Sequence, residues 1–369
     1  MFADIIGQEE ATTLLTAALR MHQLSHAYLF VGPAGLGKLE AARSLAAGLL
    51  CANGGCKTCP ICTRLARDVY PDFQIIEPDG SAGYLIDQIR ELIHDASLAP
   101  REGVHKFYVL LACDLLSGGA ADAFLKTLEE PPETVTFILI AHSLSAISAT
   151  ILSRTQVVRF KPLPTETMIA VLMESTGASE DDARIALAST GSVLEEARTF
   201  LLSPQRRATR GEVLRIIRDL STYNDREILA AAQLLKTSAE GPVAELAAAQ
   251  EAELAVRAEL LDSVASKRLE RYNKRKLTAA TRRSVSEVFS VISGLLRDAL
   301  AQHNGAPQLI LNVDALDFIA RNASCLTPAR AREGQEAIAQ ARERLARNVG
   351  VQLIFETLLF RVREVLICR

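Results

Sequence analysis

The sequence predicts an α/β unit with a parallel sheet, followed by an all-α region. In the first half of the chain, short apolar segments alternate with segments of helical period. Strand-like segments stop after "RFKPLP" at 159–164, and the pattern beyond is helical. Strands that alternate with helices in this way are typical of a parallel sheet covered by helices on both faces.

The elements of the α/β unit can be placed in order. Strand candidates lie at 26–32, 71–78, 105–113 and 134–143. Segments of helical period follow the first three of them, namely "KLEAARSLAAGLL", "GYLIDQIRELIHDASLAP" and "GAADAFLKTLEEPP". Residues 165–203 are expected to form short helices. From about residue 207 the helical period continues, with breaks expected near "EGP" at 240–242 and "NGAPQ" at 304–308.

Length and composition limit the class of protein. A chain of 369 residues exceeds one ordinary hydrophobic core, so two or three domains are expected. The net charge of −3 gives no general attraction to nucleic acid or membrane, so any such contact must be local. The start "MFADIIGQEEA" lacks the basic and apolar segments of an export signal, and no apolar run is long enough to span a membrane. We therefore expect a cytoplasmic protein that does not act at a membrane.

The stretch "VGPAGLGKLE" at 31–40 nearly matches the phosphate-binding pattern G-x-x-x-x-G-K-[ST]. It directly follows a strand candidate and opens a helix, where backbone N–H groups can converge on phosphate oxygens. The residues predicted to bind phosphate are Gly32, Gly35, Gly37 and Lys38. A glycine-rich turn without a ligand is the alternative interpretation.

Two features predict that ATP or ADP could bind here without being hydrolysed. The last position of the pattern is Leu39, which lacks the hydroxyl that ligates Mg²⁺. At the end of the strand candidate 105–113, where an ATPase carries acidic residues, the chain has Leu111 and Ala112. Asp114 follows two positions later and is expected to lie too far along the chain to replace them.

The segment "ILSRTQVVRF" places Ser153 and Arg154 at the edge of the α/β unit. An arginine here could act as a finger that stabilises transition-state charge on a nucleotide bound by a neighbouring subunit. A surface or ion-paired arginine is the alternative, and the spacing alone does not separate the two interpretations.

The segment "CANGGCKTCPIC" holds Cys51, Cys56, Cys59 and Cys62 in the spacing C-x4-C-x2-C-x2-C. Four thiolates can surround one Zn²⁺ tetrahedrally, and the two glycines between the first pair permit a tight turn. Because every ligand position is filled by the protein, the predicted zinc is structural and not catalytic. Unmetallated thiols are the alternative. The remaining cysteines, Cys113, Cys325 and Cys368, are expected to be buried small apolar residues.

Together these motifs resemble the delta-prime (δ′) subunits of the bacterial DNA polymerase III clamp loader, within the AAA+ group. The resemblance rests on "IIGQ" at 5–8, "HAYLFVGPAGLGK", the cysteine knuckle, "YPDFQIIEP", "IDQIRELI", "LKTLEEPP" at 125–132 and "LSRTQVVRF". It covers residues 1–165 well and the rest of the chain loosely. The knuckle and "LKTLEEPP" are specific to clamp-loader proteins within that group.

The resemblance implies three domains. These are an AAA+ P-loop core at 1–164 with its zinc knuckle at 51–62, a small helical lid at 165–206, and a helical collar at 207–369 that oligomerises in a pentameric ring. It further implies a non-hydrolysing subunit of a DNA-directed DNA polymerase holoenzyme, without intrinsic ATPase activity. Arg154 would then complete the ATP site of an adjacent motor subunit.

The partners implied by the resemblance are the gamma/tau motor subunits, the delta subunit, the sliding clamp and, through the complex, primed DNA. The implied location is the cytoplasmic, nucleoid-associated replisome.

The chain departs from the family's Ser-Arg-Cys motif, because Thr155 stands at the cysteine position. Motor subunits also carry a lid arginine where this chain has Leu194 and Glu195.

Two further interpretations stay open. One is an ATP-hydrolysing clamp-loader motor subunit that uses Asp114 for Mg²⁺, and the other is a scaffold that binds ATP or ADP through Lys38 without turnover.

A basic cluster at 267–283 could contact the DNA backbone or form a solvated helix face. Its members are Lys267, Arg268, Arg271, Lys274, Arg275, Lys276, Arg282 and Arg283.

Overall fold

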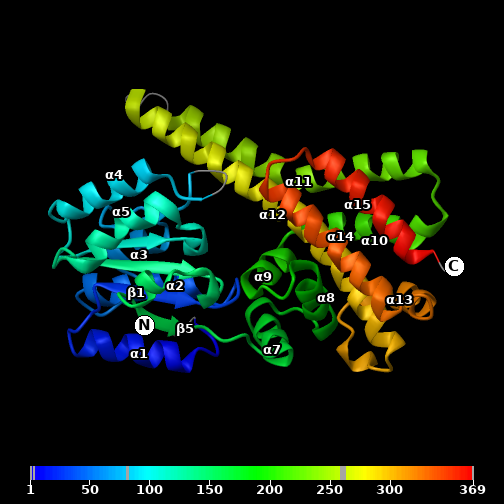
Figure 1. Cartoon of the computed structure of the whole chain (residues 1–369), viewed down its shortest axis with the longest axis horizontal. Helices are drawn as coiled ribbons and strands as arrows, with labels where there is room; N and C mark the ends of the chain where they lie inside the picture. Colours follow the sequence, from blue (N-terminus) through cyan, green and yellow to red (C-terminus); the bar gives the residue numbers. More distant parts are fainter. Residues whose placement is uncertain (1, 3–4, 80–82, 258–262, 368–369) are drawn as a thin grey trace. The chain divides into compact units, whose positions relative to one another are not determined.

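The computed structural model describes residues 2, 5–79, 83–257 and 263–367 (Figure 1). The chain divides into two compact units, residues 1–164 and residues 165–369. The predicted α/β unit followed by an all-α region is confirmed, whereas the division of the second unit into a lid and a collar stays a prediction. In the described part of the chain, no helix is both long enough and apolar enough to cross a membrane.

The first unit is built on a five-stranded parallel sheet in the order β2-β3-β4-β1-β5. The strands are β1 Ala27–Val31, β2 Phe73–Ile76, β3 Lys106–Leu110, β4 Val135–Ala141 and β5 Gln156–Arg159. The four strand candidates are confirmed, and β5 lies in the apolar segment that follows Arg154. Because β1 lies between β4 and β5, the loop after β1 leaves the sheet where the strand order reverses. In open parallel sheets, ligands usually bind at this point of the carboxyl edge.

Helices cover both faces of this sheet (Figure 1). Tyr28 and Phe30 of β1 pack with α1 Glu9–Arg20, α2 Lys38–Leu50 and α3 Pro60–Ala66 on one face. The alternate residues of β1 pack with α4 Ile86–Ser97, α5 Gly118–Glu129 and α6 Ala149–Leu152 on the other face. Two short 3-10 helices, η1 Cys113–Leu115 and η2 Leu144–Ala146, follow β3 and β4. This alternation along the strands produces the layered core.

Helix α1 was not predicted from the sequence, and its position explains the "IIGQ" segment. The side chain of Gln8, at the start of α1, makes two hydrogen bonds of 2.8 Å with the backbone N–H and carbonyl of Lys161. These bonds connect the beginning of the unit to the chain just after β5. Gly7 has a φ of 65°, which favours glycine, and a Cβ there would also displace the side chain of Leu163, 2.1 Å away.

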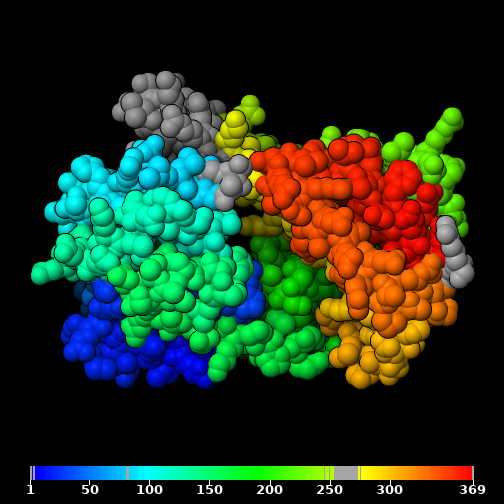
Figure 2. Space-filling view, in the orientation of Figure 1, coloured from blue at the N-terminus to red at the C-terminus, as the bar shows by residue number. Residues whose placement is uncertain are grey.

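The second unit is helical throughout its described residues. Its helices are α7 Thr165–Thr176, α8 Glu180–Thr190, α9 Leu194–Leu202, α10 Pro204–Asp219, α11 Asp225–Arg257, α12 Ser263–His303, α13 Leu316–Ala323, α14 Pro328–Ala346 and α15 Val351–Leu366, with 3-10 helices η3 Leu220–Thr222, η4 Pro307–Leu309 and η5 Val313–Ala315. Helices α10 to α15 share one apolar core, in which the rings of Phe289 and Phe355 lie 5.9 Å apart. In Figure 2, α14 and α15 (orange to red) form much of the visible surface of this unit.

The break predicted at 304–308 is confirmed, because α12 ends at His303. The break predicted at 240–242 is wrong, because α11 continues through Pro242. Proline cannot donate to the carbonyl four residues earlier, which here belongs to Ser238. The hydroxyl of Thr209 on α10 donates to that carbonyl at 2.9 Å, and the hydroxyl of Ser284 on α12 donates to the adjacent carbonyl of Ala239 at 2.7 Å. Donors from two neighbouring helices therefore stabilise the helix at its proline.

Substitution of Thr209 by valine should lower the free energy of unfolding by about 1–3 kcal/mol, because the half-buried carbonyl of Ser238 loses its donor. The loss should shrink in the Thr209→Val, Pro242→Ala double variant, since alanine restores the helical N–H donor. Urea denaturation of Thr209→Val, Pro242→Ala and the double variant measures both effects. Thr237→Val serves as the control, because its hydroxyl is exposed and lies on α11, the helix that contains Pro242. Equal effects of Thr209→Val and Thr237→Val would contradict this account of the helix.

Two isolated cysteines differ in their surroundings. Cys113 is buried as expected, and burial raises the pKa of its thiol to about 12. Cys325 is half-buried and disulfide-bonded, so its prediction as a buried small apolar residue is wrong. Local spacing gave no sign of this bond because a disulfide joins residues that only the fold brings together. Cys368 lies outside the described residues.

Candidate functional site

The loop between β1 and α2 has the backbone geometry of a phosphate-binding loop. Gly32, Gly35 and Gly37 have φ values of 150°, 76° and 79°, which favour glycine. A Cβ at Gly32 would lie 2.3 Å from the carbonyl oxygen of Phe160, so only glycine fits there. Gly37 is the N-cap of α2, where the helix presents unpaired N–H groups to an anion.

Lys38 is folded onto this loop. Its Nζ donates to the carbonyls of Gly32 and Pro33, at 2.5 Å each, and the residue is 7% exposed. Burial lowers the pKa of Lys38 to about 8, although the nearby carboxylates of Asp114 and Glu40 oppose this shift. A bound phosphate would have to replace these two carbonyls as the partner of the ammonium group.

The positions at which an ATPase would offer oxygen ligands to Mg²⁺ are apolar and pack against the core. Leu39 and Leu111 both pack against the apolar cluster that contains Phe30 and Ile140. The carbonyl of Leu111 accepts a hydrogen bond of 2.5 Å from the hydroxyl of Tyr84. The end of β3 therefore contributes side-chain packing and an internally bonded carbonyl in place of carboxylate ligands.

The carboxylate of Asp114 is hydrogen-bonded to the turn after β4. Its carboxylate accepts hydrogen bonds from the backbone N–H groups of His142, at 3.0 and 3.1 Å, and of Ser143, at 3.3 Å. The Nδ1 atom of His142 lies 2.9 Å from the same carboxylate. Burial alone would raise the pKa of Asp114, but these hydrogen bonds hold it below its ordinary value. The residue thus fixes a turn at the carboxyl edge of the sheet.

His142 was not identified as a site residue from the sequence. It lies directly after β4, at the same carboxyl edge as the phosphate-binding loop, and its side chain is 62% exposed. The sequence did contain a feature that could have identified it, because His142 is the first polar residue after a long apolar strand. Lys38, Asp114 and His142 therefore gather at one edge of the sheet.

Arg154 lies at the opposite edge. It lies two residues before the start of β5, and its carbonyl oxygen lies 3.1 Å from Nε2 of His26, which directly precedes β1. The loop with Lys38 follows the other end of β1. A five-residue strand such as β1 is about 16 Å long, so an arginine at its amino end cannot reach a phosphate at its carboxyl end.

The side chain of Arg154 is held by three neighbours. Its Nη2 atom lies 2.5 Å from Oε1 of Glu129, and its Nη1 atom donates to the carbonyl of Thr150 at 3.0 Å and the hydroxyl of Ser153 at 3.1 Å. About a third of the side chain, 32%, remains exposed. The ion pair proposed as an alternative for this residue is present, and part of the guanidinium still faces solvent.

The four cysteines of the knuckle converge. All four Sγ atoms lie within 4.8 Å of one another, and those of Cys56 and Cys59 lie 3.7 and 3.6 Å from Sγ of Cys51. Zinc–sulfur bonds of about 2.3 Å in a tetrahedron place the sulfurs about 3.8 Å apart. The backbone N–H of Cys62 also points at Sγ of Cys59, at 3.4 Å. This donor set fits a structural Zn²⁺.

Two protein-family models match the chain. Residues 7–164 match the model described as DNA polymerase III, delta subunit, and residues 251–364 match the model of the C-terminal part of that subunit. The chain belongs to the DNA polymerase III delta-subunit family of clamp-loader proteins.

Curated relatives of this clamp-loader chain include DNA polymerase III subunit gamma/tau of Mycobacterium tuberculosis, 36% identical over 189 residues, with 49% of this chain and 33% of the relative covered. Subunit tau of Escherichia coli is 37% identical over 169 residues, with 45% and 26% covered. The chain thus matches about a third or less of the length of these two relatives. A gamma subunit-related protein of Thermotoga maritima aligns in structure at 17% identity with a TM-score of 0.44, covering 95% of this chain and 98% of that protein.

The basic cluster of this clamp-loader chain is partly engaged within the second unit. Arg282 donates to Oδ1 of Asn348 at 2.7 Å, and Arg283 pairs with Glu196 at 3.0 Å. Lys276 also has an interaction partner, whereas Lys274 is exposed. The side chains of Lys267, Arg268, Arg271 and Arg275 lie outside the described residues. Because Arg282 and Arg283 have partners within the chain, the interpretation as a helix face is favoured over a DNA contact at these two residues.

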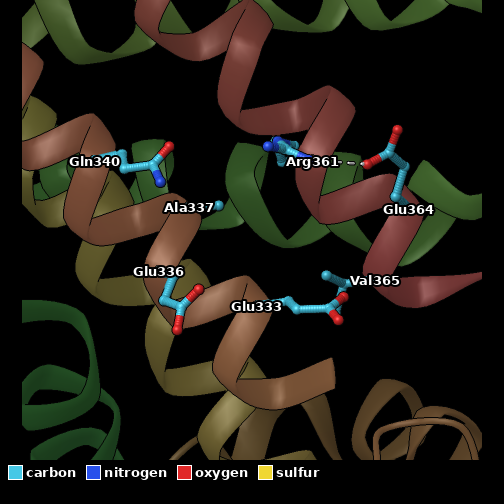
Figure 3. Close-up of a pocket in the computed structure, with 7 residues that line it drawn as sticks. All are labelled: Glu333, Glu336, Ala337, Gln340, Arg361, Glu364 and Val365. Atoms are coloured by element: carbon cyan, nitrogen blue, oxygen red, sulfur yellow. Dashed lines mark ion pairs between the residues drawn. The ribbon is translucent and has the colours of Figure 1, made fainter. Parts of the chain in front are cut away.

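A small hollow of ≈ 120 Å³ lies between α14 and α15 (Figure 3). Its lining includes the carboxylates of Glu333, Glu336 and Glu364, and Arg361 pairs with Glu364 at 3.6 Å. A lining with three carboxylates repels phosphate groups, so this hollow is not a candidate nucleotide site.

Proposed function

We propose that the chain is a delta-prime-type subunit of the DNA polymerase III clamp loader. In this role it does not hydrolyse ATP and supplies Arg154 to the ATP site of a neighbouring motor subunit. The observation that carries the proposal is the placement of Arg154 at the edge of the sheet opposite its own phosphate-binding loop. An arginine finger in that place can serve only a nucleotide held by another chain.

The residues around the chain's own loop support the absence of hydrolysis. Leu39 and Leu111 occupy the positions of the Mg²⁺ ligands and pack against the core. Asp114, the carboxylate that a motor would need, accepts hydrogen bonds from the backbone N–H groups of His142 and Ser143 and contacts the ring of His142. Without Mg²⁺ ligands, phosphoryl transfer loses both charge neutralisation and positioning.

Two ligands belong to this proposal. The loop residues Gly32, Gly35, Gly37 and Lys38 would hold the phosphates of ATP or ADP without turnover. The four thiolates of Cys51, Cys56, Cys59 and Cys62 would hold a structural Zn²⁺ that cross-links the end of α2 to the start of α3. When bound, the zinc supplies a cross-link and no chemistry.

The domain roles and partners are also proposed. Residues 1–164 would form the AAA+ core, 165–206 the lid and 207–369 the collar of a pentameric ring. The partners would be the gamma/tau motor subunits, the delta subunit, the sliding clamp and, through the complex, primed DNA, in the cytoplasm. Membership of the clamp-loader family supports this assembly.

The second candidate is an ATP-hydrolysing motor subunit. It is favoured by the 36–37% identity to gamma/tau subunits over 45–49% of the chain. It requires a Mg²⁺ ligand set, which Leu39, Leu111 and the hydrogen-bonded Asp114 do not provide.

The test that separates the candidates is ATP turnover by the purified chain with Mg²⁺, alone and with primed DNA. We expect no turnover, with or without measurable nucleotide binding. Sustained turnover that Lys38→Ala abolishes would identify the chain as a motor and overturn the proposal.

A further inference from the structure

We propose that Glu129 is a positioning residue for Arg154, which it holds ready for the neighbouring nucleotide. This inference rests on the proposed function. Glu129 is the last residue of α5, within the segment "LKTLEEPP", and its carboxylate contacts Nη2 of Arg154 at 2.5 Å. The two residues are 25 positions apart, so the fold creates this pair and local sequence does not.

The contacts of Arg154 leave donors for a ligand. A guanidinium has five N–H groups. Three of them donate hydrogen bonds, to the carboxylate of Glu129, the carbonyl of Thr150 and the hydroxyl of Ser153. Among the described residues, the other two have no acceptor, and two is the number that a bidentate contact with a phosphate uses.

The backbone of Arg154 is fixed as well. Its carbonyl oxygen lies 3.1 Å from the ring of His26, and β5, which begins two residues later, pairs with β1. A long side chain such as arginine carries about 2 kcal/mol of rotamer entropy. Because Glu129 already restricts the guanidinium, less of this entropy remains to be lost when Arg154 reaches a transition state.

The position of Glu129 also favours the pair. A carboxylate at the C-terminus of a helix is disfavoured by the helix dipole, so a cation beside it is stabilising. Glu129 is half exposed, at 50%, and does not belong to the buried core. Its substitution should therefore change the placement of Arg154 while the unit stays folded.

The test uses the reconstituted clamp loader with Glu129→Ala or Glu129→Gln in this subunit. We expect Glu129→Ala to lower kcat for DNA-stimulated ATP hydrolysis about tenfold with little change in KM for ATP, since the substrate contacts are untouched. Glu129→Gln should retain most of the activity, because its amide oxygen still accepts from Nη2. Glu130→Ala is the matched control, since the described residues include no ion pair or hydrogen bond of its side chain.

Arg154→Ala is measured in parallel, and thermal melting of each isolated variant checks folding. In the Arg154→Ala background, Glu129→Ala should add no further loss. An unchanged or raised kcat for Glu129→Ala, with Arg154→Ala impaired, would overturn the positioning role and leave the proposed function standing. A full kcat for Arg154→Ala would instead overturn the proposed function itself.

Discussion

Removal of zinc should destabilise the first unit more than any other single change considered for that unit. The knuckle at 51–62 buries Cys51 and Cys62, while Ala52, Asn53, Lys57 and Thr58 are exposed, so apolar packing alone cannot hold it. Structural zinc contributes on the order of 10 kcal/mol in small zinc domains, and the loss here should reach several kcal/mol. We expect a strong chelator or Cys59→Ser to lower the melting temperature clearly and to expose the knuckle to proteases.

The measurement combines metal analysis with thermal denaturation before and after chelation. One zinc per chain is expected, and Cys59→Ser should lose it. Cys113→Ala is the control, because this buried thiol lies outside the knuckle and should leave the zinc content unchanged. A metal-free chain with the same melting temperature in chelator would show that the four thiols have no metal-dependent role.

Replacement of Arg154 by alanine should produce the largest functional effect. An arginine finger contributes about 10³-fold or more to phosphoryl transfer, so hydrolysis at the neighbouring ATP site should fall by that order. Arg154→Lys should restore little, because an ammonium group cannot make the bidentate contact of a guanidinium. Folding and ring assembly should be unaffected, since the side chain is partly exposed and outside the core.

Single-turnover ATP hydrolysis by the assembled ring measures this effect at the level of one site. Arg20→Ala, at an exposed arginine that ends α1, is the control for a general loss of positive charge. A wild-type rate with Arg154→Ala would show that Arg154 is an ordinary ion-paired surface residue, the alternative that its spacing allowed.

The parts of the fold that the sequence predicted depend on local pattern. Helix α2 begins at Lys38 and ends at Leu50, as predicted, because a glycine-rich turn and a cysteine segment bound it. The four cysteines could be predicted as a cluster because their spacing is short. In contrast, Pro242 predicted a break that does not occur, because the hydroxyl of Thr209 on α10 replaces the hydrogen bond that the proline removes. The hydroxyl of Ser284 on α12 adds a bond to the adjacent carbonyl.

The arrangement of the candidate site depends on strand order, which local pattern does not specify. The parallel pairing of β5 with β1 shows that Arg154, which precedes β5, and Lys38, which follows β1, lie at opposite edges of the sheet. The pair of Asp114 and His142, 28 positions apart, is likewise created by neighbouring strand ends. From the sequence, Asp114 could be judged only by its distance along the chain, whereas the structure shows which donors occupy it.

The most direct test of the central claim compares ATP hydrolysis by the isolated chain with hydrolysis by the reconstituted ring, each with and without Arg154→Ala. The account predicts no hydrolysis by the isolated chain, hydrolysis by the wild-type ring, and a large loss in the ring that carries Arg154→Ala. Hydrolysis by the isolated chain, together with a ring that is indifferent to Arg154→Ala, would contradict it.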